Sequence, residues 1–433
     1  MNKLKTNSQS YLGPFITMVI LMSLVGLITS INQQFQAPMQ AAYLRQAGDL
    51  ENTLATLINF SFFLAYLVMG SAAAKAIDKV GYRGALIRGL VILLVGFTLF
   101  ELSALQFTMF EGTNVVIAGA TIPYAYFIFL LGSFVAGTSL TFLQAAINPY
   151  LVASKVPGTS GVQRQTIAGA GNSSMTTIGP LIVAFLIFGG KEADDIKVTS
   201  LFLPIAILIG VVAILAIVLK NINLPDIEGS TAEKDEVLPK SVWSFSHLTL
   251  GVIAIFFYVG VEVAVGANIN LYAISLKDVD GNSLYTIGQA AKMASLYWGG
   301  MLVGRLFGSF VSKISANVQL LFTTIGAGIL VVLSMMTGNP WLLVGVGLFH
   351  SIMWPAIFAL AIEGLGRYTS KGSGALMMGV VGGAILPFTQ GVFADVLGSW
   401  HWTWALVVVG EIYLLYYALY GYKVKQRGDE VVA

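Results

Sequence analysis

The stretch that decides the fold is Leu248-Thr-Leu-Gly-Val-Ile-Ala-Ile-Phe-Phe-Tyr-Val-Gly-Val-Glu262-Val-Ala-Val-Gly-Ala-Asn-Ile-Asn-Leu271. It can cross a bilayer, because a helix needs about 20 mostly apolar residues to span the hydrocarbon core. Glu262 lies near its middle. An ionisable group at membrane depth is costly and usually faces a polar cavity or a partner. The stretch therefore predicts a membrane protein with a polar interior, which favours a transport function.

The composition extends this interpretation to the whole chain. Of 433 residues, 56% are hydrophobic and 10% are charged, whereas a soluble domain carries about 25% charged residues. A net charge of +2 is too small to indicate nucleic-acid binding, and the absence of cysteine excludes disulfides and thiolate metal sites. The three histidines are too scattered for a zinc site. We expect no cofactor, and no metal except possible Na⁺ near Glu262.

Twelve segments are long and apolar enough to be spans. They cover 12–37, 53–76, 84–107, 122–152, 163–189, 199–221, 245–275, 285–312, 317–338, 341–363, 373–397 and 401–422. The pattern predicts an all-α membrane protein with 12 transmembrane helices in two six-helix bundles. The bundles cover 12–221 and 245–422 and are joined by a linker at 222–244, with short terminal segments at 1–11 and 423–433.

The basic residues predict the orientation of these spans. One side receives only Arg45, Lys191, Lys197, Lys277 and Lys292, and all other Lys and Arg residues fall on the opposite side. Cytoplasmic loops carry the excess of basic residues, so this division places both termini in the cytoplasm. An even number of spans agrees with that placement.

Helix breaks occur at matching positions in the two halves. The fourth span contains Asn148-Pro149 and the tenth contains Trp354-Pro355. Parallel repeats of this kind are typical of transporters whose binding site lies near the bilayer midplane, between the halves.

Several motifs resemble those of a known family. The segment Asp78-Lys-Val-Gly81-Tyr-Arg83 is similar to a loop motif of the major facilitator superfamily. Longer stretches resemble the fucose–galactose–cation symporter family, especially its glucose, galactose and N-acetylglucosamine branch. They are Leu143-Gln-Ala-Ala-Ile-Asn-Pro-Tyr150, Asn172-Ser173, Gly179-Pro180, Tyr258 to Gly266, Ser295 to Ser309, and the run from His350 to Asp395.

The resemblance implies a secondary transporter that imports a neutral hexose or N-acetylhexosamine by symport with H⁺ or Na⁺, using alternating access. It would be a multi-pass protein of the bacterial inner membrane, in contact with lipid, and a monomer. Four positions depart from the family pattern. The helix-one acid is replaced by Gln33 or Gln34, the helix-four glutamate by Gln144, a helix-five glutamine by Gly169, and a helix-ten asparagine by His350. The fucose-branch carboxylates are thus absent, although polar groups suited to a sugar remain.

Amides and aromatic rings are the candidate sugar ligands. Amides offer both donors and acceptors to hydroxyl groups, and aromatic faces pack against apolar C–H patches. The candidates are Gln33, Gln34, Gln144, Asn148, Asn172, Asn268, Trp298, His350 and Trp354. The alternative is structural: amides and small residues also join packed membrane helices, and a lone histidine is often a satisfied core group.

Glu262 is the candidate cation-coupling residue. A desolvated carboxylate binds a proton more readily, which suits H⁺, whereas an ionised one among amides suits Na⁺. The alternative is a structural acid fixed by hydrogen bonds. Glu411 and Glu101 are interpreted as structural or interfacial. The gating charges expected at the inner face are Asp78, Arg83, Arg305 and Arg367.

Other functions stay open. A facilitator without ion coupling would use the same fold, and so would an exporter of drugs or metabolites, although an amide-rich cavity argues against greasy substrates. A membrane sensor or intramembrane enzyme would need an output domain or a catalytic set, and the sequence shows neither. We therefore expect a transporter and not an enzyme.

Overall fold

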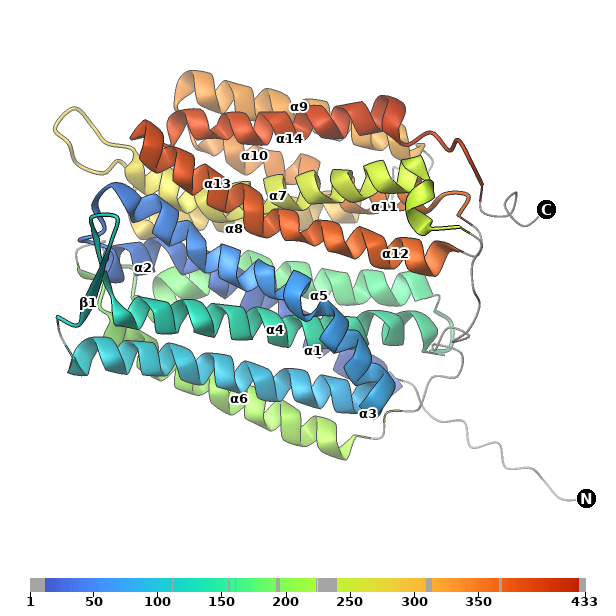
Figure 1. Cartoon of the computed structure of the whole chain (residues 1–433), viewed down its shortest axis with the longest axis horizontal. Coiled ribbons are helices and arrows are strands. Elements are labelled where there is room, and N and C mark those ends of the chain that lie inside the picture. The colour runs from blue at the N-terminus through green and yellow to red at the C-terminus, as the bar shows by residue number, and fades with distance from the viewer. Residues whose placement is uncertain are drawn as a thin grey trace, which may run out of the picture.

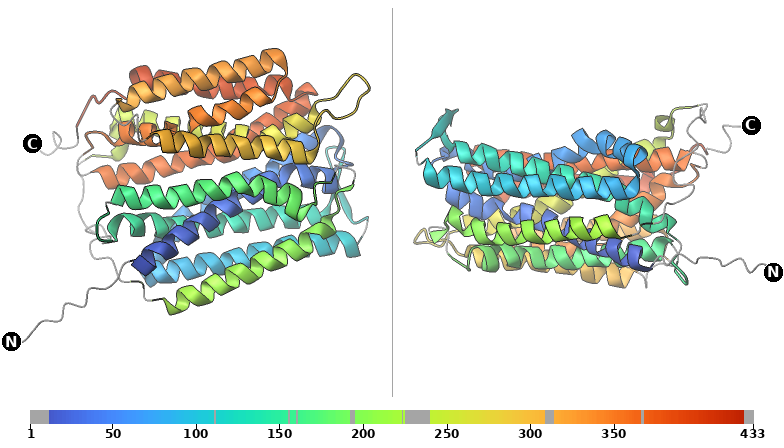
Figure 2. Two further views of the ribbon diagram at one scale, coloured as in Figure 1. Left: turned by 180° about the vertical axis from the view of Figure 1, so that it is seen from behind. Right: turned by 90° about the horizontal axis from the view of Figure 1, so that it is seen from below.

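A computed structural model describes residues 12–110, 112–154, 156–159, 161–191, 195–222, 224, 240–308, 314–365 and 368–427. The described chain is helical apart from one short hairpin, and the helices run side by side along the long axis of the molecule (Figures 1 and 2). The predicted linker 222–244 and the two terminal segments lie largely outside the described residues.

The N-terminal half comprises the elements up to α6. They are α1 (Leu12–Gln34), α2 (Gln36–Tyr43), η1 (Gly48–Leu50), α3 (Glu51–Met109), β1 (Asn114–Ile117), β2 (Ala120–Pro123), α4 (Tyr124–Ala153), α5 (Gly161–Leu181), η2 (Ile182–Ile187), η4 (Val198–Leu201) and α6 (Phe202–Asn221). Strands β1 and β2 pair antiparallel. We call the end of the molecule that carries them the hairpin end. The opposite end, where α1 begins, is the terminal end (Figure 1).

The C-terminal half lies beside it, as the yellow to red helices of Figure 1 show. Its elements are η5 (Val242–Ser244), α7 (Ser246–Ser275), α8 (Ile287–Gly308), α9 (Ala316–Thr337), α10 (Trp341–His350), α11 (Met353–Ile362), α12 (Thr369–Met378), η7 (Gly379–Val381), α13 (Gly382–Leu397), η8 (His401–Trp404), α14 (Ala405–Tyr416) and η9 (Tyr417–Gly421). The halves meet through α3 against α13 and α5 against α8.

Eleven stretches of the described chain are long and apolar enough to span a membrane. Each corresponds to one predicted span, with ends that differ by a few residues; the first, for example, runs to Tyr43 instead of 37. The remaining predicted span, 285–312, corresponds to α8. This helix is not among the eleven, because Lys292, Arg305 and several glycines lower its hydropathy.

Glycine and proline account for the bends in these helices. Gly81 (φ 71°, ψ 176°) interrupts α3, so the second and third predicted spans meet at a sharp kink. This backbone region is open mainly to glycine. Pro355 lacks the N–H that would bond the carbonyl of Ser351, and the predicted tenth span divides into α10 and α11 there. The other predicted break, at Asn148-Pro149, is absent, since α4 continues to Ala153.

Close helix contacts depend on glycine. A Cβ on Gly382 of α13 would overlap the backbone carbonyl of Phe256 on α7. The two helices can approach this closely only because the side chain is absent.

We therefore expect Gly382→Val to destabilise the C-terminal half by about 1–3 kcal/mol, the usual cost of overpacking. Thermal unfolding of the detergent-purified protein measures this. The matched control is Gly210→Val on α6, where a Cβ meets nothing within 4 Å. Equal midpoints for the two variants would contradict the close approach.

Candidate functional site

An amide network joins the two halves on the hairpin side of Glu262. Gln36 of α2 donates to Oδ1 of Asn268 on α7 at 2.8 Å, and Asn268 donates to Oε1 of Gln390 on α13 at 2.9 Å. Asn59 of α3 donates to Oε1 of Gln36. All these side chains are buried. Buried amides are costly unless they are hydrogen-bonded, so these bonds favour contact between the halves here.

Gln34 and Asn270 belong to the same amide network. Asn270 of α7 donates to Oε1 of Gln34, and Gln34 donates from Nε2 to the carbonyl of Gly266 at 3.2 Å. The ring of Trp298 packs so closely on Gly266 that a Cβ there would overlap it. Two predicted ligands, Gln34 and Trp298, therefore meet at Gly266 from opposite halves.

Several buried polar atoms around this network have no hydrogen-bond partner among the described residues. They are Oε1 of Gln33, Oδ1 of Asn270, Nε1 of Trp298 and Nε2 of Gln390. Two are acceptors and two are donors. Since hydroxyl groups both donate and accept, a small polyhydroxylated molecule suits this set.

The predicted ligands Gln144 and Asn148 lie on the other side, toward the terminal end. Gln144 donates to the hydroxyl of Tyr66 at 2.7 Å, and Tyr66 stacks on Phe63. Gln144, Asn148 and Tyr66 are each only half-buried, in contrast to the amide network. The polar side chains toward the terminal end are thus more exposed than those of the amide network.

Glu262 lies at the seam between the halves. Its side chain is 14% exposed, and its Oε1 accepts from the hydroxyl of Tyr258 at 3.0 Å. Arg305 of α8 approaches the same oxygen at 3.8 Å. The Arg305 guanidinium also donates to Oγ of Ser173 on α5 and to the carbonyl of Ser351 at 3.4 Å. Ser351 has this carbonyl free because of Pro355. Arg305 therefore joins the acid to both halves, a role that the inner-face interpretation did not anticipate.

His350 is fully buried beside Glu262. Its Nε2 contacts Oε1 of Glu411 on α14 at 2.8 Å, and its Nδ1 contacts the hydroxyl of Tyr297 on α8 at 2.8 Å. Both ring nitrogens are already engaged. The structure consequently places His350 in a fully buried position among Tyr258, Tyr297 and Glu411 and not among the half-buried polar side chains.

The remaining predicted residues are more dispersed. Asn172 donates to the carbonyl of Met22 within the N-terminal half at 3.1 Å, and Trp354 packs against Phe358 and Tyr258. Of the gating charges, Arg83 is partly buried in α3, the side chain of Asp78 is outside the described part, and Arg367 lies outside the described residues. In the part of the chain that the structure describes, no three His, Asp or Glu residues form a metal-binding group.

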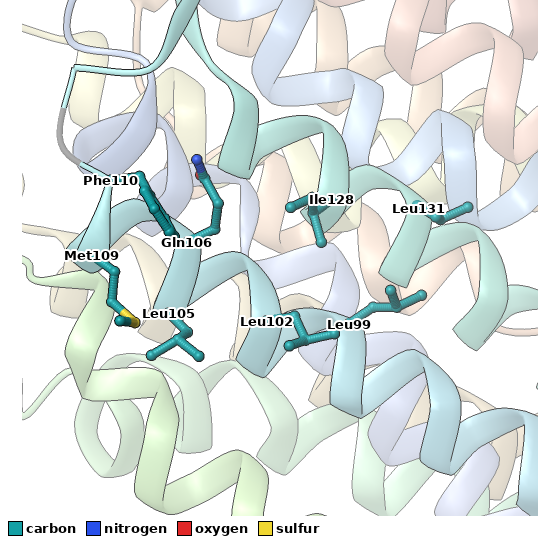
Figure 3. A pocket seen from close by; sticks show the side chains of 8 residues that line it. All are labelled: Leu99, Leu102, Leu105, Gln106, Met109, Phe110, Ile128 and Leu131. Carbon is teal, nitrogen blue, oxygen red and sulfur yellow. The ribbon is translucent and has the colours of Figure 1, made fainter.

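A separate hollow of about 410 Å³ lies between α3 and α4 (Figure 3). Its lining includes several leucines, Met109 and Phe110, and Gln106 is the single polar residue in it. Such a lining suits an acyl chain and does not suit a sugar.

Sequence reasoning missed two acids that join elements of this region. Glu411 was interpreted as structural or interfacial without its partner His350, and Asp395 was not singled out. Asp395 of α13 accepts from the backbone N–H groups of Asn52 and Thr53 at 3.0 and 2.6 Å, at the start of α3. The signal was available for Glu411, because it too is an acid within an apolar helix.

Comparison with known proteins assigns the family. The Major Facilitator Superfamily matches residues 15–387. A glucose/galactose transporter of Brucella abortus is 33% identical over 431 residues, 97% of each chain. The L-fucose-proton symporter of Escherichia coli is 25% identical and covers 90% of this chain and 89% of its own. Among solved structures, the transporter FucP in the outward conformation has a TM-score of 0.66 at 22% identity, covering 95% of this chain and 99% of that one.

The chain belongs to the Major Facilitator Superfamily, and within it to the fucose–galactose–cation symporter family. It is a multi-pass integral membrane protein with the all-helical fold of that superfamily. The matched relatives and folds are transporters and not enzymes.

Proposed function

We propose that this protein imports a neutral hexose, such as glucose or galactose, or an N-acetylhexosamine, together with H⁺. The observation that carries the proposal is the amide network, where unpaired donors and acceptors from both halves lie at one interface. The relatives named glucose/galactose transporter support the substrate class, and the relative named L-fucose-proton symporter supports coupling to protons.

The surroundings of Glu262 favour H⁺ over Na⁺. Arg305 already places a positive charge 3.8 Å from the carboxylate, and Tyr258 donates a hydrogen bond to it. A sodium ion at this oxygen would be repelled by the guanidinium and would lack further carboxylate ligands. A proton needs no set of coordinating oxygen ligands.

The proposed topology keeps the predicted boundaries. Twelve spans form two bundles, 12–221 and 245–422, with 222–244 as a cytoplasmic linker. Both termini are cytoplasmic in the bacterial inner membrane, and the carrier acts as a monomer. The terminal end then faces the cytoplasm, and the buried amide network closes the periplasmic side. Partial exposure of Gln144, Tyr66 and Glu262 supports an inward-facing arrangement.

Uptake by proteoliposomes tests the proposal. Radiolabelled glucose, galactose, fucose and N-acetylglucosamine are offered under an inward proton gradient, an inward sodium gradient, or neither. We expect concentrative uptake of at least one sugar with the proton gradient alone. Uptake that equilibrates under every gradient would favour a facilitator, and no uptake of any sugar would reject the substrate class.

Gln144 offers a test of the sugar-binding surface. We expect Gln144→Leu to raise the KM for sugar about five- to tenfold, because one hydrogen bond contributes about 1 kcal/mol. Initial uptake rates over a range of sugar concentrations measure this. Gln106→Leu, in the apolar hollow between α3 and α4, is the matched control and is expected to leave KM unchanged. Equal KM values for the two variants would remove Gln144 from the binding surface.

A further inference from the structure

A buried histidine–carboxylate pair lies next to the Tyr297 hydroxyl that contacts the backbone of Glu262, and the proposed function gives this pair no role. His350 and Glu411 are 0% and 3% exposed, and their Nε2 and Oε1 atoms are 2.8 Å apart. Thr324 of α9 donates to the other carboxylate oxygen at 2.6 Å. Both members carry ionisable side chains, and protein encloses both of them.

The hydroxyl of Tyr297 connects the pair to α7. It lies 2.8 Å from Nδ1 of His350 and 3.1 Å from the backbone carbonyl of Glu262. A phenol has one proton to donate. A carbonyl can only accept, so when Tyr297 donates to Glu262, the Nδ1 atom of His350 must carry a hydrogen and donate to Tyr297.

The direction in which Tyr297 donates its proton is therefore linked to the number of protons on the pair. With Nδ1 protonated, the short contact between Nε2 and Glu411 needs one further proton, on either Nε2 or the carboxylate. The pair is then neutral overall, and every contact has one donor and one acceptor. Without that proton, the pair carries one negative charge. The single hydrogen of His350 must then lie on Nε2, and Tyr297 must turn its hydroxyl from Glu262 to Nδ1.

The geometry points to the His350–Glu411 pair as a proton-binding site of the carrier, whose occupancy Tyr297 transmits to α7 at Glu262. This inference rests on the proposed function, since it supplies a second proton site for the same symport. Binding adds one proton, forms one N–H or O–H bond and converts the pair from one negative charge to neutrality. No other reactant is required.

The groups around the pair fit this function. From α7 the titratable groups are Tyr258 and Glu262. The hydroxyl of Tyr258 lies 3.0 Å from Oε1 of Glu262 and 3.1 Å from the carbonyl of His350, and its one proton goes to one of these two acceptors at a time. From α8 they are Tyr297 and Arg305. From α9 the contacting group is the uncharged Thr324. The charged state of the pair therefore acts on helices that also hold Glu262 and Arg305, where the halves meet.

The test combines infrared titration with transport. In the purified parent, the C=O stretching band of a protonated carboxyl should rise and fall with pH, and Glu411→Gln should remove one such band. Glu101→Gln, at another membrane-depth acid, is the control and should leave that band intact. This measurement requires no sugar, so its result is independent of the proposed function. A pH-difference spectrum unaltered by Glu411→Gln would overturn the inference.

Transport separates proton coupling from a structural role. We expect Glu411→Gln to reduce the accumulation ratio about tenfold or more under a proton gradient, while sugar counterflow is retained. A purely structural role would lower both together, and that result overturns the inference. If Glu411→Gln does not fold, the Tyr297→Phe variant tests the inference. It should keep the titrating band and lose accumulation, and full accumulation in Tyr297→Phe would contradict transmission through this hydroxyl.

Discussion

Replacing Glu262 with glutamine is expected to abolish concentrative uptake while preserving exchange of sugar across the membrane. Glutamine has nearly the same shape and still accepts a hydrogen bond from Tyr258, but it cannot bind and release a proton. It also removes the negative charge that faces Arg305 at 3.8 Å. The accumulation ratio under a proton gradient should fall about a hundredfold or to equilibrium, because proton binding at Glu262 is then no longer coupled to sugar transport.

Paired measurements make this result specific. Counterflow, in which external labelled sugar exchanges with unlabelled sugar inside, should stay within about threefold of the parent, because one lost contact changes binding only modestly. The control is Glu101→Gln, which should accumulate sugar normally. Accumulation by Glu262→Gln at the parent level would remove Glu262 from coupling. Loss of both accumulation and counterflow would assign it to sugar binding instead.

Much of the fold follows from the sequence, because a bilayer imposes one dominant rule. Every span must be a long apolar helix, so hydropathy alone located eleven of the predicted spans. The predicted span 285–312 corresponds to α8, whose hydropathy is lower because it contains Lys292 and Arg305. Hydropathy did not predict the hairpin of β1 and β2, because a short apolar stretch between two spans gives no signal that separates a strand from the end of a helix.

The site was harder to predict, because it depends on which helices touch. Spacing along one helix does not show which residues of other helices it contacts, and only the fold brings Gln36 of α2 to Asn268 of α7, which in turn contacts Gln390 of α13. His350 and Glu411 are likewise 61 residues apart and meet only because α10 and α14 both pack against α9 and α7. One sequence cannot specify such pairs, because many helix arrangements satisfy the same apolar pattern.

Asp395 provides the second large effect, on the balance between the two orientations of the carrier. Its carboxylate accepts from the backbone N–H groups of Asn52 and Thr53 and from the Asn52 side chain at 2.8 Å. These groups begin α3, and the N-terminus of a helix attracts negative charge. Because Asp395 is on α13 and α3 belongs to the other half, the contact holds the hairpin end closed. Opening that end must break it.

We therefore expect Asp395→Asn to shift the carrier toward the state open at the hairpin end by about tenfold, equivalent to about 1.4 kcal/mol. The chain has no cysteine, so a single Thr56→Cys can report the shift. Thr56 is fully buried at the seam, where it faces Gly391 of α13. A membrane-impermeant maleimide applied from the hairpin side should label it slowly in the parent and about tenfold faster with Asp395→Asn.

The matched control is Asp280→Asn, an exposed acid in the loop between α7 and α8 at the same end of the molecule. It removes the same charge without touching α3, so it should leave the labelling rate unchanged. If both variants accelerated labelling equally, general electrostatics and not the helix contact would be responsible. If neither did, the hairpin end would be held by the amide network alone, because Gln36, Asn268 and Gln390 would still join the halves there.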